Sequence, residues 1–263
     1  MAHPDREALR ALGEALPPLG EARPLPGLDE YLGFYGLDVP RQLPGVDYRL
    51  GTVASGHYQL AVHCWQQAGA RHNLLLVHGY LDHVGLYRHL IRHALARGCN
   101  VVAFDLPGHG LSTGTPAGIE VFREYGDAIR DVLAAVEQPD LPWQAMAQST
   151  GGAALIEFAR HHPPWPFSGT VLLAPLLRPA GWRRVFAAHA LLHRFVATVP
   201  RAFTRNSSDR SFLDFLRQDP LQPHRIQMSW VGALRRWLAE LPLQDLGVGP
   251  ALLVQGDADT TVD

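Results

Sequence analysis

The residues best suited to chemistry lie in the segment AMAQSTGGAAL, with Ser149 at its centre. An apolar run precedes this serine and a stretch of small residues follows it, which predicts a strand, a sharp turn and a helix. The spacing fits the Gly-x-Ser-x-Gly pattern of a nucleophile elbow, with Ala147 in place of the first glycine and Gly151 as the second. Small neighbours are needed because the helix packs tightly on the strand while the serine projects into the site. We therefore predict that Ser149 is a nucleophile.

A serine hydroxyl attacks a carbonyl group efficiently only when a base accepts its proton and donors await the oxyanion. The backbone N–H of Thr150, at the start of the predicted helix, is one predicted donor. The second is predicted in the loop HGYLDHVGLY, where Tyr80 follows Gly79 and an apolar run. Gly79 has no side chain, so the backbone can come close to the reacting carbon. We expect neither a metal nor a cofactor.

Strands and helices must position these residues, and the apolar pattern predicts both. Short apolar runs that are typical of strands buried on both faces occur at residues 74–77, 101–104, 143–147, 171–174 and 251–254. The segments between these runs carry apolar residues at helical spacing. In HYQLAVHCW the two faces alternate, as in a half-exposed antiparallel strand. This alternation predicts an α/β fold with a mainly parallel sheet and helices on both faces. Ligands of such sheets bind beyond the carboxyl ends of the strands.

The chain is predicted to have an arm, a core and a cap. Residues 1–45 are rich in proline and glycine and are expected to form an arm laid over the domain. Residues 46–175 and 243–263 form the predicted core, and residues 176–242, with two helix-like stretches and no strand, a helical cap. Trp182 and Phe186 of the cap are candidate lining residues of an acyl-binding pocket. Simple packing of their helix explains them equally well.

Composition excludes several classes of protein. The chain has 263 residues and a formal net charge of -2, which gives no basic field for nucleic acid. Its two cysteines cannot form a disulfide framework. The N-terminal stretch lacks the order of a signal peptide, and no apolar run is long enough to span a membrane. We expect a cytoplasmic protein of undetermined oligomeric state. Peripheral membrane contact through the arginine-rich cap stays open.

Five separated motifs between about residues 45 and 263 resemble the α/β-hydrolase fold and, within it, the monoacylglycerol lipase and lysophospholipase group. HGYLDHVGLY is similar to that group's His-Gly loop, and FDLPGHGLSTG to its Gly-His-Gly-x-Ser segment, where His109 is expected to be structural. AQSTGG is similar to its elbow and TRNSSDRSFLDFLRQDPL to its Arg-Asn and Asp-Pro-Leu landmarks. LLVQGDAD is similar to its last-but-one strand and acid loop. Gln148 departs from the histidine that the group often has there.

The resemblance implies that Ser149 is the nucleophile, that Tyr80 and Thr150 are the oxyanion donors and that Asp259 is the acid of a triad. Asp257 is the competing acid. Asp259 is preferred because Gly256 and Val262 bracket it in the group's Gly-x-x-Asp-x-x-Val pattern.

The base of the triad is missing at the expected place, because in this fold it follows the acid and no histidine follows Asp259. His161 and His162 end the elbow helix, roughly 15 Å from its start at 1.5 Å per residue. The other histidines near the site are expected to be structural. The last strand and helix of the fold are also absent, so the strand at 251–254 would be an apolar edge. We expect that the sequence is truncated and that the chain as given is inactive or nearly so.

The leading hypothesis is a serine hydrolase acting on lipid esters such as monoacylglycerols or lysophospholipids through an acyl-enzyme. Thioester and peptide substrates stay open for the same nucleophile. Dehalogenases and epoxide hydrolases use an aspartate nucleophile, so Ser149 argues against them. An alternative of another class is a noncatalytic ligand-binding relative, which the retained Ser149 and Asp259 oppose.

Overall fold

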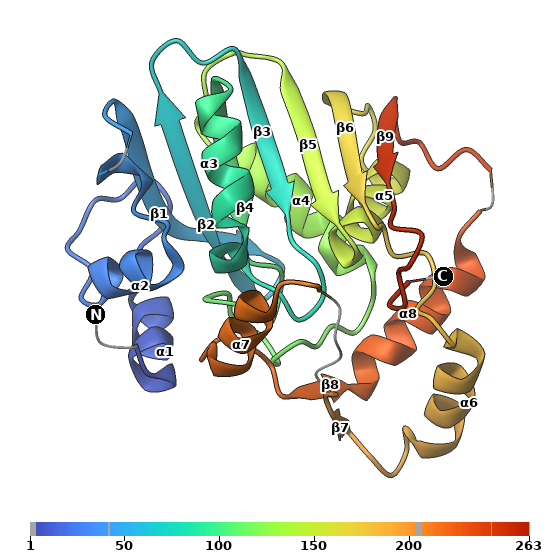
Figure 1. Cartoon of the computed structure of the whole chain (residues 1–263). Coiled ribbons are helices and arrows are strands. Elements are labelled where there is room, and N and C mark those ends of the chain that lie inside the picture. Colours follow the sequence, from blue (N-terminus) through green and yellow to red (C-terminus); the bar gives the residue numbers. More distant parts are fainter. Residues whose placement is uncertain (1–3, 42, 203–206, 243, 263) are drawn as a thin grey trace.

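A twisted sheet of seven strands forms the centre of the computed structural model, which describes residues 4–41, 43–202, 207–242 and 244–262 (Figure 1). The strands, in the order in which they lie side by side, are β1 (Val46–Ser55), β2 (Tyr58–Gln67), β4 (Cys99–Phe104), β3 (His72–Val77), β5 (Trp143–Gln148), β6 (Phe167–Leu173) and β9 (Ala251–Val254). The pairs β1–β2 and β2–β4 are antiparallel, and the other pairs are parallel. The apolar runs therefore form strands of a mainly parallel sheet, as predicted.

Helices cover both faces of this sheet. One face packs against α4 (Arg123–Ala135) and α5 (Thr150–His161), which supply most of the helical side chains of one buried cluster. The other face packs against α3 (Arg88–Ala96), which follows the short 3-10 helix η2 (Val84–Tyr87). Each helix presents apolar residues at helical spacing to the sheet, so burial of these faces stabilises the layers.

The first 45 residues add to the second layer. Their helices are α1 (Arg6–Ala15), α2 (Leu28–Tyr35) and the 3-10 helix η1 (Val39–Arg41). Leu9, Leu12 and Tyr31 are almost fully buried in the cluster that also holds α3. The backbone between the helices pairs with β1, because Leu19 N–H donates to Thr52 O and Thr52 N–H donates to Pro17 O. This arm is thus anchored by buried leucines and by main-chain hydrogen bonds.

The arm explains why the prediction of a half-exposed strand for HYQLAVHCW was wrong. Residues 60–65 of β2 are buried on both faces. Ala61 and Trp65 lie in the cluster of the arm, and the buried His63 is paired with Tyr48 of β1 at 2.8 Å. Alternation of polar and apolar residues normally marks a solvated face. Here the small Ala61 and the paired His63 fit beneath the arm.

The segment between β6 and β9 lies beyond the carboxyl ends of the parallel strands (Figure 1). It contains the helices α6 (Trp182–Leu192), α7 (Arg210–Gln218) and α8 (Met228–Glu240). The expectation of no strand was wrong, because β7 (Thr198–Pro200) and β8 (Arg225–Gln227) form a two-stranded antiparallel ribbon. Strands of three residues are too short to show a period, so the sequence did not reveal them. Arg205 and Asn206, which carry the predicted Arg-Asn landmark, lie outside the described residues.

The most exposed large apolar side chains among the described residues lie in two places. Leu252 and Leu253 of the edge strand β9 are 61% and 60% exposed, so this strand is an apolar edge, as expected. Leu191 and Phe195, at the end of α6, are 74% and 84% exposed.

Among the described residues, no helix combines the length and apolar character needed to cross a membrane.

Candidate active site

Ser149 occupies a strained turn between β5 and α5. Its φ of 48° and ψ of -116° place a non-glycine residue at positive φ, a conformation that costs free energy and persists only where surrounding bonds enforce it. The Ser149 N–H donates to Leu173 O at 2.9 Å, and the Ser149 carbonyl accepts from the N–H groups of Gly152 and Leu176, each at 2.9 Å. The backbone is thus fixed to β6 and α5, which leaves the hydroxyl as the free end of the residue.

Glycines let the elbow helix approach the sheet. A Cβ atom on Gly151 would lie 2.5 Å from the carbonyl oxygen of Val77, and one on Gly152 would lie 2.8 Å from Cβ of Pro175. Contacts this short cannot exist without movement of the backbone, so both positions need glycine. Ala147, which replaces the first glycine of the motif, is fully buried among core residues. A methyl group is therefore tolerated before the nucleophile.

A cavity of about 300 Å³ brings the predicted nucleophile and oxyanion residues together. Ser149, Thr150 and Tyr80 all line it. Most of the other lining side chains are apolar and come from the cap, among them Leu176, Val185, Leu213, Leu216, Ile226, Trp230, Val231 and Leu234. The N-terminus of α5 carries a partial positive charge, which favours negative charge that develops next to Ser149.

A ring contact and a hydrogen bond fix Tyr80 in the wall of this cavity. Its ring stacks on Trp230 with centroids 3.7 Å apart and an interplanar angle of 13°. Its hydroxyl donates to Ala117 O at 2.9 Å. Trp230 belongs to α8, so the cap supports the loop from which the second oxyanion donor is expected. The sequence analysis missed Trp230, because nothing in its local pattern distinguishes it from a core residue of α8.

A buried hydroxyl joins this loop to the elbow. The Tyr87 hydroxyl accepts from the Gly79 N–H at 3.1 Å and lies 2.6 Å from Oε1 of Gln148, the residue before the nucleophile. Oδ2 of Asp82 lies 3.1 Å from the same hydroxyl. Burial raises the pKa of Asp82, and the hydrogen bond from Tyr87 acts against this rise. Gln148 therefore contacts the loop after β3 through Tyr87, at the position where the resembled group often has histidine.

Asp259 lies in the loop after β9. Its Oδ1 atom accepts from the N–H groups of Thr261 and Val262 at 2.7 and 3.3 Å, and its Oδ2 accepts from Gln255 at 2.9 Å. Partial burial acts to raise the pKa of Asp259, but these hydrogen bonds outweigh it and hold the pKa below its usual value. Thr261 and Val262 line the cavity beside Ser149, whereas Asp259 itself is not among the lining residues. Asp257 is exposed.

The two predicted substrate-binding aromatics are not in the cavity wall. Trp182 packs edge-on against Phe186 with ring centroids 5.7 Å apart, and Phe186 lies against the hydrophobic core. Val185, between them in α6, lines the cavity instead. The side of α6 that faces the cavity therefore includes Val185 and excludes the two aromatic residues.

Two arginines line the cavity, and the sequence analysis did not select either. Arg201 follows β7, and its Nη1 atom donates to the Gln222 side chain at 2.5 Å and to Pro223 O at 3.3 Å. Arg217 lies in the last turn of α7 and pairs with Asp214 at 2.7 Å. Leu213 and Leu216 of the same helix are buried. Their spacing of three residues within SFLDFLRQ is typical of one face of a helix, and this pattern could have predicted that α7 forms part of the cavity wall.

A buried ion pair links the loop after β3 to the cap. Nε2 of His83 lies 2.8 Å from Oδ2 of Asp219, and both side chains are fully buried. The Tyr35 hydroxyl, from α2 of the arm, donates to the other carboxylate oxygen at 2.6 Å. Burial acts to lower the pKa of His83, but the Asp219 carboxylate outweighs it and raises this pKa. Burial likewise acts to raise the pKa of Asp219, and His83 and Tyr35 hold it below its usual value.

Four other histidines, His78, His109, His161 and His162, have structural partners. His78 donates from Nδ1 to Gly79 O and accepts at Nε2 from the Leu106 N–H, and burial lowers its pKa well below its usual value. Burial likewise lowers the pKa of His109 to about 4. His161 and His162 pair with acids of α5 and α4. Among the described residues, no histidine lines the cavity beside Ser149.

Comparison with known proteins identifies relatives of this chain. A family model described as serine aminopeptidase, S33, matches residues 68–263. The chain is 30% identical over 247 residues to a mouse (Mus musculus) protein named monoglyceride lipase, which covers 85% of this chain and 77% of the mouse protein. It is also 30% identical over 241 residues to the human (Homo sapiens) protein of that name, with the same coverage of both chains.

Solved structures resemble the fold. A soluble variant of monoglyceride lipase from Saccharomyces cerevisiae, solved with a substrate analogue, superposes with a TM-score of 0.69 at 18% identity, over 84% of this chain and 80% of the yeast chain. Monoacylglycerol lipase from Paleococcus ferrophilus superposes with a TM-score of 0.61 at 25% identity, over 76% of this chain and 79% of that chain.

Proposed function

Because this chain belongs to the α/β-hydrolase family whose model is described as serine aminopeptidase, S33, we propose that it is a serine hydrolase that cleaves esters of long acyl chains. The observation that carries the proposal is the strained Ser149 at the floor of a largely apolar cavity, next to Thr150 and Tyr80. The monoglyceride lipases among its relatives support a carboxylic ester as the substrate.

The proposed reaction proceeds through an acyl-enzyme. The Ser149 hydroxyl oxygen attacks the ester carbonyl carbon as a base takes its proton, and the N–H groups of Thr150 and Tyr80 stabilise the oxyanion. The carbon–oxygen bond to the alcohol then breaks, the alcohol leaves with a proton, and water cleaves the acyl-enzyme to release the acid and restore Ser149. Asp259 is the proposed acid that orients the base. Because no described histidine lines the cavity, residues 1–263 by themselves are expected to turn over esters slowly.

The cavity favours one apolar chain. Leucine, valine, isoleucine and tryptophan side chains of the cap form most of its wall, so each methylene group that enters gains about 0.8 kcal/mol of transfer free energy. A peptide would bring unpaired N–H and C=O groups against the same wall, at a cost in free energy. We therefore propose a monoacylglycerol or lysophospholipid rather than a peptide as the substrate.

A substrate panel tests this proposal. We expect release of fatty acid from 1-monodecanoylglycerol to exceed hydrolysis of a leucine anilide by roughly a hundredfold or more, since ester cleavage uses the apolar wall and amide cleavage is intrinsically slower. Fatty acid release is measured by titration and anilide cleavage by absorbance, with Ser149→Ala as the background for both. Faster anilide cleavage would favour a peptidase. Strong binding of the ester without any turnover, even with added imidazole, would favour a noncatalytic ligand-binding protein.

We further propose that the end of α6 contacts the lipid phase. Leu191 and Phe195 are the two most exposed large apolar residues at this end, and Arg194 lies between them in the sequence. Apolar side chains with adjacent arginines suit an anionic interface, where the chains enter the acyl region and the arginines meet the head groups.

The double variant Leu191→Ser with Phe195→Ser is expected to bind anionic vesicles roughly a hundredfold more weakly, because each large apolar side chain that enters the acyl region contributes about 1.5–3 kcal/mol when fully buried. Co-sedimentation with vesicles measures the change. Val121→Ser is the control, since Val121 is 48% exposed and lies just before α4, outside α6. An equal loss of vesicle affinity in Val121→Ser would show that binding depends on the polarity of the whole surface and not on this end of α6.

A further inference from the structure

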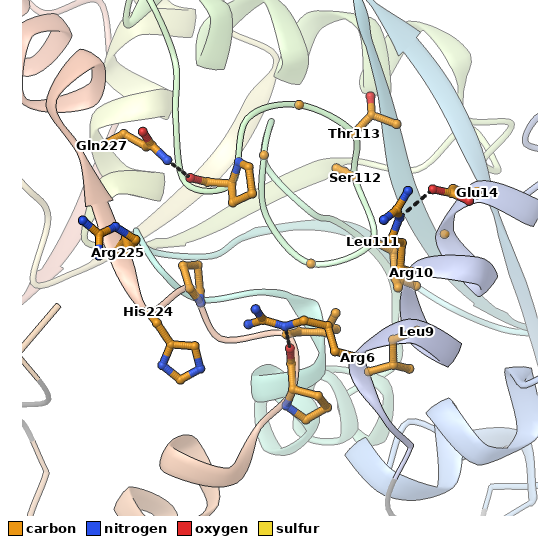
Figure 2. A pocket seen from close by; sticks show the side chains of 18 residues that line it. Arg6, Leu9, Arg10, Glu14, Leu111, Ser112, Thr113, His224, Arg225 and Gln227 are labelled. Carbon is orange, nitrogen blue, oxygen red and sulfur yellow. Dashed lines mark hydrogen bonds and ion pairs between the residues drawn. The ribbon is translucent and has the colours of Figure 1, made fainter. Parts of the chain in front are cut away.

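A groove of about 710 Å³ lies where the arm, the core and the cap meet. Its walls are α1, the glycine-rich loop of residues 108–116 and the cap segment of residues 220–227 (Figure 2). None of the residues that line the cavity beside Ser149 lines this groove. The groove is therefore a second concave site, and its size falls in the range of roughly 300–1,000 Å³ that small-molecule sites have.

The groove carries excess positive charge. Three arginines line it, Arg6, Arg10 and Arg225, and the only lining acid among the described residues is Glu14. Glu14 pairs with Arg10 at 2.8 Å, so these two charges offset each other. Within the described part of the chain, neither Arg6 nor Arg225 forms an ion pair with a carboxylate. Two guanidinium charges thus remain without a counter-charge.

Carbonyl groups hold these two arginines in place without neutralising them. Arg6 donates from Nε to Pro220 O and from Nη2 to Gln222 O, each at 2.9 Å, so it bridges α1 and the cap. Arg225 donates to the backbone oxygen of Thr198 at 3.1 Å. Figure 2 shows the Arg6 side chain pointing from α1 toward the cap segment that carries His224 and Arg225. Side chains held in this way lose less entropy when they bind an anion.

Much of the remaining wall is apolar, although Ser112, Thr113, His224 and Gln227 also line it. Leu111, Leu221, Pro116, Pro220 and Pro223 provide hydrocarbon surface between the charged groups. Planar guanidinium groups match carboxylate and phosphate oxygens. A ligand that suits the groove therefore has an anionic group for Arg6 and Arg225 and a hydrocarbon part for the leucines and prolines.

We propose that this groove is a binding site for an amphiphile with one anionic head group, a carboxylate or a phosphate. The site binds its ligand whether or not Ser149 is reactive. A bound ligand contacts α1 and the cap segment together, so it stabilises the association of the arm with the cap. The carboxylate source is a free fatty acid and the phosphate source is a phosphorylated lipid.

Calorimetric titration of residues 1–263 tests the proposal with four probes. Decanoate and decyl phosphate carry the two head groups, decanol carries the same chain without charge, and inorganic phosphate has no chain. Saturable binding of decanoate or decyl phosphate is expected, roughly tenfold or more tighter than that of decanol and of inorganic phosphate. The tighter of the two charged probes identifies the head group. Binding of decanol as tight as that of both charged probes would overturn the proposal.

Variants locate the bound probe. Arg225→Gln is expected to weaken binding roughly tenfold, because it removes a charged hydrogen-bond donor. Glu14→Gln is expected to strengthen binding roughly twofold to threefold, because it frees the charge of Arg10. A damaged fold cannot produce this gain. Arg217→Gln, which alters the cavity beside Ser149, is the matched control and should leave the affinity unchanged. Loss of binding in Arg217→Gln, or no change in the Arg225 and Glu14 variants, would overturn the proposal.

Discussion

Replacing Ser149 with alanine is expected to abolish labelling of the protein by a fluorophosphonate. In this reaction the serine oxygen bonds to phosphorus, fluoride leaves, and the hydroxyl proton passes to a base. Alanine has no atom that can form the bond, so the loss should be complete. The matched control is Ser168→Ala, because Ser168 is exposed and its hydroxyl donates to Trp143 O, at the opposite end of β5. This control should be labelled at the wild-type rate.

Added imidazole sharpens the same experiment. A positioned base contributes roughly 10²–10⁴-fold to such reactions, and no described histidine lines the cavity beside Ser149. Labelling of residues 1–263 should therefore be slow and should rise roughly tenfold with imidazole in solution, which recovers part of that factor. The rise should occur in the Ser168→Ala control and not in Ser149→Ala. If Ser149→Ala and Ser168→Ala were labelled at the same rate, Ser149 would not be the nucleophile. Fast labelling without imidazole would mean that another group of the protein already serves as the base.

Asp219→Asn is expected to lower the free energy of unfolding by roughly 3 kcal/mol. Removal of one partner from a buried ion pair leaves the other charge uncompensated, which costs roughly 3–5 kcal/mol, and asparagine retains part of the hydrogen bonding. Urea unfolding measures the change. Asp214→Asn is the matched control, because Asp214 lies in α7 and its ion pair with Arg217 is largely exposed. Exposed pairs contribute little, so the control should unfold like the wild type.

The pH dependence distinguishes an ion pair from simple packing. The pKa of Asp219 is held below its unfolded value near about 3.9, so its contribution is present above that pH and is lost as the pH falls through the folded pKa. The pKa of His83 is raised above about 6.5, so its contribution is present below that pH and is lost as the pH rises through the folded pKa. The difference between wild type and Asp219→Asn should be largest from about pH 4 to 6.5. A difference that does not vary with pH would contradict a charged pair.

The elbow and the parallel strands could be predicted because their signals are local. Ser149 needs small neighbours within a few residues, and each buried strand is a continuous apolar run, so short windows of sequence contain the information. The loop residue Tyr80 could be proposed for the same reason, since it directly follows a strand and a glycine.

Features that depend on distant partners could not be predicted in this way. His83 looks like any loop histidine until Asp219 is placed against it, 136 positions away in the sequence. The alternation of residues in β2 predicted that its second face is solvated, whereas the arm covers this face in the structure. The helix α7 and the lining residues Arg201 and Arg217 follow from packing of the cap, and their sequence contains only one short amphipathic pattern. The spacing of Trp182 and Phe186 places them on one face of α6. Which face of α6 lines the cavity depends on the rotation of the helix about its axis, and this rotation is set by contacts with distant residues.

The arm bonds to the cap from outside the region that the family model matches. The family model begins at residue 68, whereas Arg6 and Tyr35 lie before it and bond to the cap at Pro220, Gln222 and Asp219. Substitutions of Arg6 or Tyr35 are therefore expected to weaken the contact between arm and cap while Ser149 and Asp259 stay the same. In evolutionary terms, the bonds that hold the cap to the rest of the chain are encoded partly outside the segment that the family model matches.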